Sequence, residues 1–152
     1  MQKIVLLALV VFAGISVHAQ NGSATQVEWT YTAKKISAKV YEVHMTAKIG
    51  AGWHLYAQNA GSGPISTSFS LTANPLLTPT GTIKEVGKLK KVFEQAFKSE
   101  VRYYENSVDF VQTVQLKSAI KTSLAGKVEF MVCNDHECLP PTDVPFSVAV
   151  GS

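Results

Sequence analysis

The amino-acid sequence predicts an all-β protein, an immunoglobulin-like antiparallel β-sandwich with a cysteine pair on its C-terminal hairpin. Apolar and polar residues alternate with a period of two over several segments, and Gly, Pro, Asn and Ser separate these segments. Such alternation buries one face of each strand and exposes the other, which is typical of antiparallel sheets. About seven or eight short strands in one domain favour a sandwich.

The first two strands are expected at residues 27–32 and 41–49. In the first, Val27, Trp29 and Tyr31 alternate with glutamate and threonine side chains. In the second, apolar residues stand at every other position from Tyr41 to Ile49. Both segments are rich in the β-branched and aromatic residues that favour strands.

Four further strands are expected in the rest of the chain. They are a short one at 69–71, a longer one at 108–116, one at 128–132 and a last one at 144–150, each with alternating Val, Leu or Phe residues. Between them, the window 88–98 is short and polar, so we expect a loop there with at most one helical turn.

The N-terminus has the pattern of a cleaved leader. Lys3 precedes an apolar run from Ile4 to Ile15, and Val17 and Ala19 suit the −3 and −1 positions of a signal-peptidase site. We therefore expect a signal peptide at residues 1–19 and one domain at residues 20–152. No later run approaches the ~18 apolar residues that a spanning helix needs, so we expect no transmembrane segment in the mature chain.

The charge of the chain excludes some classes of partner. The formal net charge is only +3, and one of the basic residues is Lys3 in the leader. A balance this small does not indicate nucleic-acid binding or attraction to an anionic membrane surface. Export would place the two cysteines, Cys133 and Cys138, where disulfides persist, and their short spacing favours a bond between them.

The cysteines lie on a hairpin that is the most informative part of the sequence. A strand leads into Cys133, four polar residues follow, and Cys138 precedes Pro140 and Pro141 and then the last strand. A loop this small contributes only ~2 kcal/mol of chain-entropy stabilisation, less than a bond between distant strands. Prolines cannot extend the strand ladder, so another protein's sulfur could approach Cys138.

Other interpretations of the pair remain open at this point. A purely structural disulfide is common in exported proteins. Metal binding by Cys133, His136 and Cys138 has less support, because a fourth ligand is not evident and the spacing matches no common zinc pattern. Asp135 and Glu137 would disfavour a nearby thiolate, whereas a protonated His136 would favour one.

This hairpin resembles the active-site signature of the amino-terminal periplasmic domain of the thiol:disulfide interchange protein DsbD. The signature, Cys, a short polar tip and then Cys-x-Pro-Pro, covers Cys133 to Pro141, with a tip of four residues where the best-known members have five. The segments Gly52 to Tyr56 and Phe97 to Val101 are also similar to segments of that family. Here His54 replaces a tyrosine of the family pattern.

The resemblance implies a role for each residue of the site. Cys138 would form the mixed disulfide and Cys133 would resolve it. A cap loop carrying a phenylalanine would cover the pair, and Phe97 or Phe93 would fill that role. His54 and Tyr56 would lie beside the pair.

We therefore expect a periplasmic thiol–disulfide exchange module that passes electrons between thioredoxin-like envelope proteins, without a cofactor or metal. The family implies a connection with cytochrome c maturation, and a separate membrane reductase is a candidate electron source. The chain has no Cys-x-x-Cys, so it would depend on another protein for electrons. We expect a monomer. The alternative is a non-catalytic immunoglobulin-like binding module with a structural disulfide.

Overall fold

The computed structural model describes residues 22–151, which form β-strands and one short 3-10 helix, η1 (Ser23–Gln26). The predicted leader and its cleavage site lie outside these residues. The strands are β1 (Val27–Lys35), β2 (Val40–Ile49), β3 (His54–Gly61), β4 (Ser68–Leu71), β5 (Leu77–Gly87), β6 (Lys90–Glu94), β7 (Ser99–Tyr104), β8 (Ser107–Leu116), β9 (Thr122–Phe130), β10 (Val132–Cys133) and β11 (Thr142–Val150).

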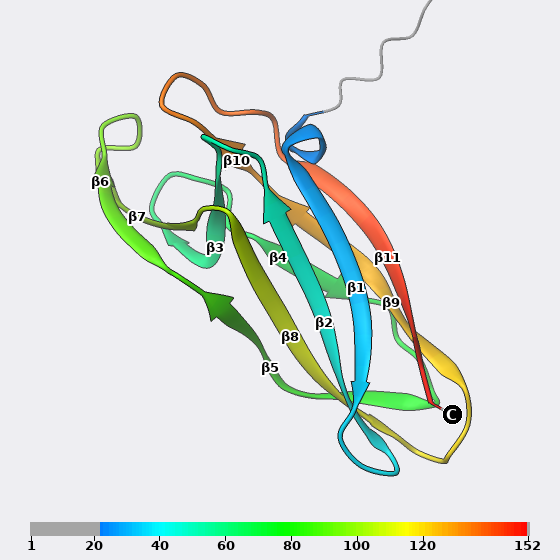
Figure 1. The fold of residues 1–152 in the computed structure, drawn as a ribbon. Helices are drawn as coiled ribbons and strands as arrows, with labels where there is room; N and C mark the ends of the chain where they lie inside the picture. Colours follow the sequence, from blue (N-terminus) through cyan, green and yellow to red (C-terminus); the bar gives the residue numbers. More distant parts are fainter. Residues whose placement is uncertain (1–21, 152) are drawn as a thin grey trace, which may run out of the picture.

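The strands form antiparallel sheets that enclose one main core (Figure 1). One sheet has the order β1-β2-β8-β5, and another has the order β11-β9-β4. Their inner faces meet in a cluster that includes Met45 and Phe110 from the first sheet and Phe130 and Phe146 from the second. The prediction of an antiparallel all-β sandwich is therefore confirmed.

The expected alternation is visible in the burial of single strands. In β2, every second side chain from Tyr41 to Ile49 is buried, and the side chains between them are exposed or half-buried. Strand β8 shows the same pattern from Val108 to Leu116. Each buried set faces the main core, so hydrophobic burial fixes the register of these strands.

The prediction for the window 88–98 was wrong. Residues 90–94 form strand β6, and a turn at residues 95–98 leads into β7. Strand β6 is short and polar because it lies at the edge of its sheet, where most of its side chains are exposed. Strand β5 was also not predicted, since most of its residues are exposed and it has no alternation of buried and exposed residues over its first half.

A third sheet, with the order β10-β3-β7-β6, carries the cysteine end of the molecule. Its strand β3 is buried on both faces, because Leu55 packs in the main core while Tyr56 packs in a second, smaller cluster. The β6–β7 turn and the loop between β10 and β11 lie at the same end of the molecule (Figure 1). Within residues 22–151, no helix is long and apolar enough to cross a membrane.

Candidate functional site at the cysteine hairpin

The site begins where the chain that follows β9 leaves β11 and pairs with β3. Strand β11 pairs with β9 as far as Thr142 opposite Phe130. Beyond that point Val132 and Cys133 pair with β3 instead, and Pro140 and Pro141, which have no amide hydrogen, precede β11. The cysteine loop therefore projects past the β9–β11 ladder.

The tip of the loop is held by its own polar groups. Oδ1 of Asn134 accepts hydrogen bonds from the amides of His136 and Glu137, each at 2.8 Å. The amide of Asn134 donates to the carbonyl oxygen of Glu137 at 2.9 Å. This arrangement is the way in which an asparagine side chain stabilises a tight turn, and it brings the two cysteines to face each other as an isolated bridge.

Cys133 and Cys138 form a disulfide, and their Cα atoms are 4.0 Å apart. The two residues have very different surroundings. Cys133 is 0% exposed and belongs to the second cluster, with Tyr56 and Met131. Cys138 is exposed and lines a surface cleft. The bond therefore joins a buried cysteine to one that is exposed at the surface.

Strand pairing places an aromatic group beside the buried cysteine. His54 stands directly opposite Cys133 in the antiparallel pair β10–β3, and opposite residues project to the same face of a sheet. Tyr56, two positions further along β3, projects to that face as well. The ring of His54 also stacks on Tyr103 of β7, with the ring centroids 4.1 Å apart.

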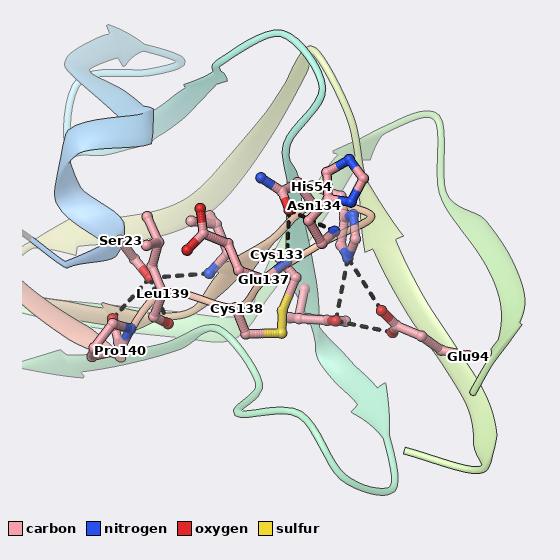
Figure 2. Close-up of a disulfide and its surroundings, with 12 residues drawn as sticks. Ser23, His54, Glu94, Cys133, Asn134, Glu137, Cys138, Leu139 and Pro140 are labelled. Atoms are coloured by element: carbon pink, nitrogen blue, oxygen red, sulfur yellow. Dashed lines mark hydrogen bonds and ion pairs between the residues drawn. A yellow bond between two sulfur atoms is a disulfide. The ribbon is translucent and has the colours of Figure 1, made fainter. Parts of the chain in front are cut away.

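A chain of polar contacts links these residues to β6. The hydroxyl of Tyr56 donates to Oε2 of Glu94 at 2.9 Å, and Nε2 of His54 lies 3.2 Å from the same hydroxyl. Nε2 of His54 is also 3.8 Å from Oε1 of Glu94. Figure 2 shows Glu94 reaching from its strand toward the disulfide. Sequence reasoning missed Glu94, because its window was interpreted as a loop and one glutamate there carries no distinguishing signal.

Burial shifts the pKa values of His54 and Tyr56. It lowers the pKa of His54, an effect that the nearby Glu94 carboxylate opposes. Burial also raises the pKa of Tyr56, and the hydrogen bond to Glu94 adds to that rise. His54 is consequently neutral and Tyr56 protonated near neutral pH.

The exposed side of the disulfide opens on a cleft of about 440 Å³. One wall is the cysteine loop, from Asn134 to Cys138, and it includes His136. The other wall is formed by the end of β6 and the start of the β6–β7 turn, with His54 and Tyr103 between them. The structure thus brings Cys138, His54 and His136 together around one opening, while Cys133, bonded to Cys138, is buried and does not line it.

The two candidate cap residues occupy different places. Phe93 is 60% exposed and lines the cleft with Cys138. Phe97 is half-buried and packs against the second cluster, edge-on to Tyr56 at a centroid distance of 6.1 Å. It also lies so close to Gly63, a residue with φ of 114°, that a Cβ at that position would collide with it. Phe93 therefore lines the same cleft as Cys138, whereas Phe97 packs against Tyr56.

One further contributor to the site comes from the start of the described chain. Ser23 is fully buried, and its hydroxyl accepts a hydrogen bond from the amide of Val132 at 3.1 Å and donates to the carbonyl oxygen of Pro140 at 2.9 Å. The segments on the two sides of the cysteine loop are thereby joined to η1 (Figure 2). No sequence pattern indicated this role, because the contact spans more than a hundred residues.

The family profile for the N-terminal domain of the thiol:disulfide interchange protein DsbD matches residues 23–149 of the chain. The chain belongs to this family. The match includes the complete cysteine hairpin and the strands that surround it, so the resemblance noted in the sequence is confirmed. No curated protein matches the chain significantly by sequence.

Two solved structures share the fold. The N-terminal periplasmic domain of ScsB from Proteus mirabilis has a TM-score of 0.60 and 16% identity, with 80% of this chain and 45% of that chain covered. The reduced N-terminal domain of DsbD from Neisseria meningitidis has a TM-score of 0.52 and 14% identity, with 82% and 86% covered. The chain thus spans less than half of the ScsB chain that it matches.

Proposed function

We propose that the domain is a periplasmic thiol–disulfide exchange module whose reactive group is the Cys133–Cys138 pair. The observation that carries this proposal is the asymmetry of the bond, with one sulfur buried and the other exposed at a cleft. Membership of the DsbD N-terminal family supports the same chemistry. A structural bond would gain more by joining distant strands than by closing so short a loop.

The exchange proceeds through a mixed disulfide. A partner thiolate attacks Sγ of Cys138, the Cys133–Cys138 bond breaks, and the Cys133 sulfur leaves with the electron pair and takes up a proton. A second thiol of the partner then attacks the partner's own bonded sulfur and releases the Cys138 thiol. The partner is oxidised to a disulfide and the pair is reduced to two thiols, and the reverse sequence passes the electrons on.

We propose thioredoxin-like envelope proteins as the partners, because they carry paired thiols that can complete both steps. A separate membrane reductase is the candidate source of electrons, and cytochrome c maturation is a candidate use. The leader, residues 1–19, would direct the chain to the periplasm. Mass spectrometry of envelope fractions should then find a mature chain that begins at Gln20, and an intact Met1 in the cytoplasm would contradict this location.

The test of the exchange function is a redox titration of the oxidised protein in glutathione buffers, with alkylation and mass spectrometry to count free thiols. We expect reduction without unfolding at a potential above about −300 mV, the value below which structural disulfides usually lie. The Cys133→Ala/Cys138→Ala double variant is the matched control, and its circular dichroism should show a retained fold. A bond that is reduced only when the protein unfolds would overturn the proposal in favour of a structural disulfide.

A further inference from the structure

The wall of the cleft opposite the cysteine loop is held by few backbone contacts. Its residues belong to the end of β6 and to the β6–β7 turn, residues 95–98. Strand β6 lies at the edge of its sheet and pairs with β7 alone among the strands of residues 22–151. Segments with exposed backbone and little buried apolar surface open locally at low free energy. The position of this wall therefore depends strongly on its side-chain contacts.

Tyr56 supplies contacts before and within the turn. Before the turn, Glu94 accepts the hydrogen bond of the Tyr56 hydroxyl at 2.9 Å. Within it, Phe97 packs edge-on against the ring of Tyr56. Tyr56 itself is 0% exposed and is fixed in the second cluster beside Cys133. The turn is thus anchored to the same buried group that supports the disulfide.

His54 completes the hydrogen-bonded chain. The single proton of the Tyr56 hydroxyl is directed at Glu94, so the hydroxyl oxygen is free to accept a hydrogen bond from the N–H at Nε2 of His54. The network therefore assigns the neutral tautomer with its proton on Nε2. His54 then donates to Tyr56 and Tyr56 donates to Glu94, so the hydrogen bonds run in one direction from β3 to β6.

We propose that His54 and Glu94 are positioning residues for the exchange site: the chain His54–Tyr56–Glu94 holds the β6–β7 turn beside the disulfide, and protonation of His54 favours a displaced turn that leaves Cys138 more open to thiols. The consequence for thiols rests on the proposed exchange function. The position of the turn does not, and it can be measured without any exchange reaction.

The direction of the pH effect follows from the surroundings of His54. In the closed arrangement burial is the largest influence, and it lowers the pKa of the ring. The charged groups that face the ring from the neighbouring elements act in part against burial: Glu94, Glu105 and Asp135 raise the pKa, and Lys90 lowers it. Displacing the turn would expose the ring to water and return its pKa toward the ordinary 6.5. Protons then bind the displaced arrangement more tightly, so acid shifts the equilibrium toward it.

Amide hydrogen exchange at the turn is the direct test. The amide of Phe97 donates to the carbonyl of Glu94 at 3.2 Å, and that of Lys98 donates to the carbonyl of Gln95 at 3.3 Å. We expect their protection in the oxidised full chain, corrected for intrinsic exchange, to fall between about pH 8 and pH 5, the range in which histidine titrates. Glu94→Ala, which removes the acceptor, and Tyr56→Phe, which removes the donor, should each lower protection roughly threefold to tenfold at neutral pH, the effect of one lost hydrogen bond.

Three further variants separate this role from general destabilisation. His54→Gln keeps an N–H donor of similar reach but cannot be protonated, so its protection should not change with pH. His136→Asn removes the other histidine of the cleft and should leave the acid effect in place. Tyr104→Phe removes a bond of the same kind, from Tyr104 to Glu85 at 3.0 Å, away from the cleft, and should leave the turn unaffected.

Two results would overturn the inference: protection at Phe97 and Lys98 that is the same at all pH values in the wild-type chain, or an equal loss of protection in Tyr56→Phe and Tyr104→Phe. The rate of disulfide reduction by 2-mercaptoethanol, per thiolate, should rise by a similar factor in Tyr56→Phe, which changes no charge in the cleft. A disulfide that resists this thiol in every variant, with a turn that still responds to pH, would refute the exchange function but not the role of His54, Tyr56 and Glu94 in holding the turn. A reducible disulfide with a turn that does not respond to pH would refute that role.

Discussion

Cys133 is fully buried, whereas Cys138, the residue to which it is bonded, is exposed at the cleft. Two structural features separate them. Cys133 is the last residue of strand β10, which pairs with β3, a strand that is buried on both faces. Cys138 precedes two prolines that cannot join the ladder. An attacking thiol should therefore react at Cys138 and not at Cys133.

The first prediction concerns the support of the cysteine loop. Ser23→Ala removes the acceptor of the Val132 amide, which is buried. An unsatisfied buried donor costs about 1–3 kcal/mol, so chemical denaturation should show a loss of stability of this order. Thr25→Ala is the matched control, because the Thr25 hydroxyl bonds to Gly22 in an exposed position. Equal losses in both variants would mean that Ser23 has no special role.

The second prediction distinguishes the two phenylalanines. Phe93 lines the cleft, so Phe93→Ala should speed reaction of the reduced pair with a small disulfide while stability stays nearly constant. Phe97 packs between Tyr56 and Gly63, so Phe97→Ala should lower the stability of the turn as well. Stopped-flow kinetics and thermal unfolding measure the two effects. If neither substitution changes the reaction rate, shielding of the pair by phenylalanine is wrong.

The third prediction concerns the charge of the attacking thiol. Glu94, Asp135 and Glu137 line the cleft, and its lining residues include no lysine or arginine. At low ionic strength a cationic thiol such as cysteamine should reduce the disulfide faster, per thiolate, than the anionic 2-mercaptoethanesulfonate, by roughly tenfold. This preference should shrink as salt is added.

Neutral variants locate the origin of this preference. The double variant Asp135→Asn/Glu137→Gln should reduce the ratio of the two rates. Glu42→Gln changes the net charge by one at a residue of β2 that does not line the cleft, and should leave the ratio almost unchanged. Equal rates for both thiols in the wild-type protein would contradict the prediction.

The strands that face the main core could be predicted from sequence, because burial on one face produces a period of two. Strands β2 and β8 are examples, with each buried side chain at every other position. Strands β3, β5 and β6 could not be predicted in this way. Strand β6 has too few buried residues to show a pattern, and β3 is buried on both faces, so His54 to Ala57 are all buried in succession.

The cysteine pair could also be predicted, because a short local motif, Cys133 to Pro141, identifies it. The rest of the site depends on contacts between distant segments. Glu94 reaches Tyr56 only because β6 and β3 flank β7, and Ser23 reaches Val132 only because η1 packs against the cysteine hairpin. Neither residue type nor local spacing carries that information.

The central claim is that Cys138 exchanges and Cys133 resolves, and trapping of mixed disulfides tests it most directly. Cys133→Ser leaves the exposed sulfur without its resolving partner, so it should accumulate mixed disulfides with thioredoxin-like envelope proteins. These should be visible on non-reducing gels and collapse on adding reductant. Cys138→Ser leaves only the buried sulfur and should trap far fewer. Equal trapping by the two variants would contradict the assignment of roles, and no trapping by either, with a bond that resists mild reductant, would contradict the exchange function itself.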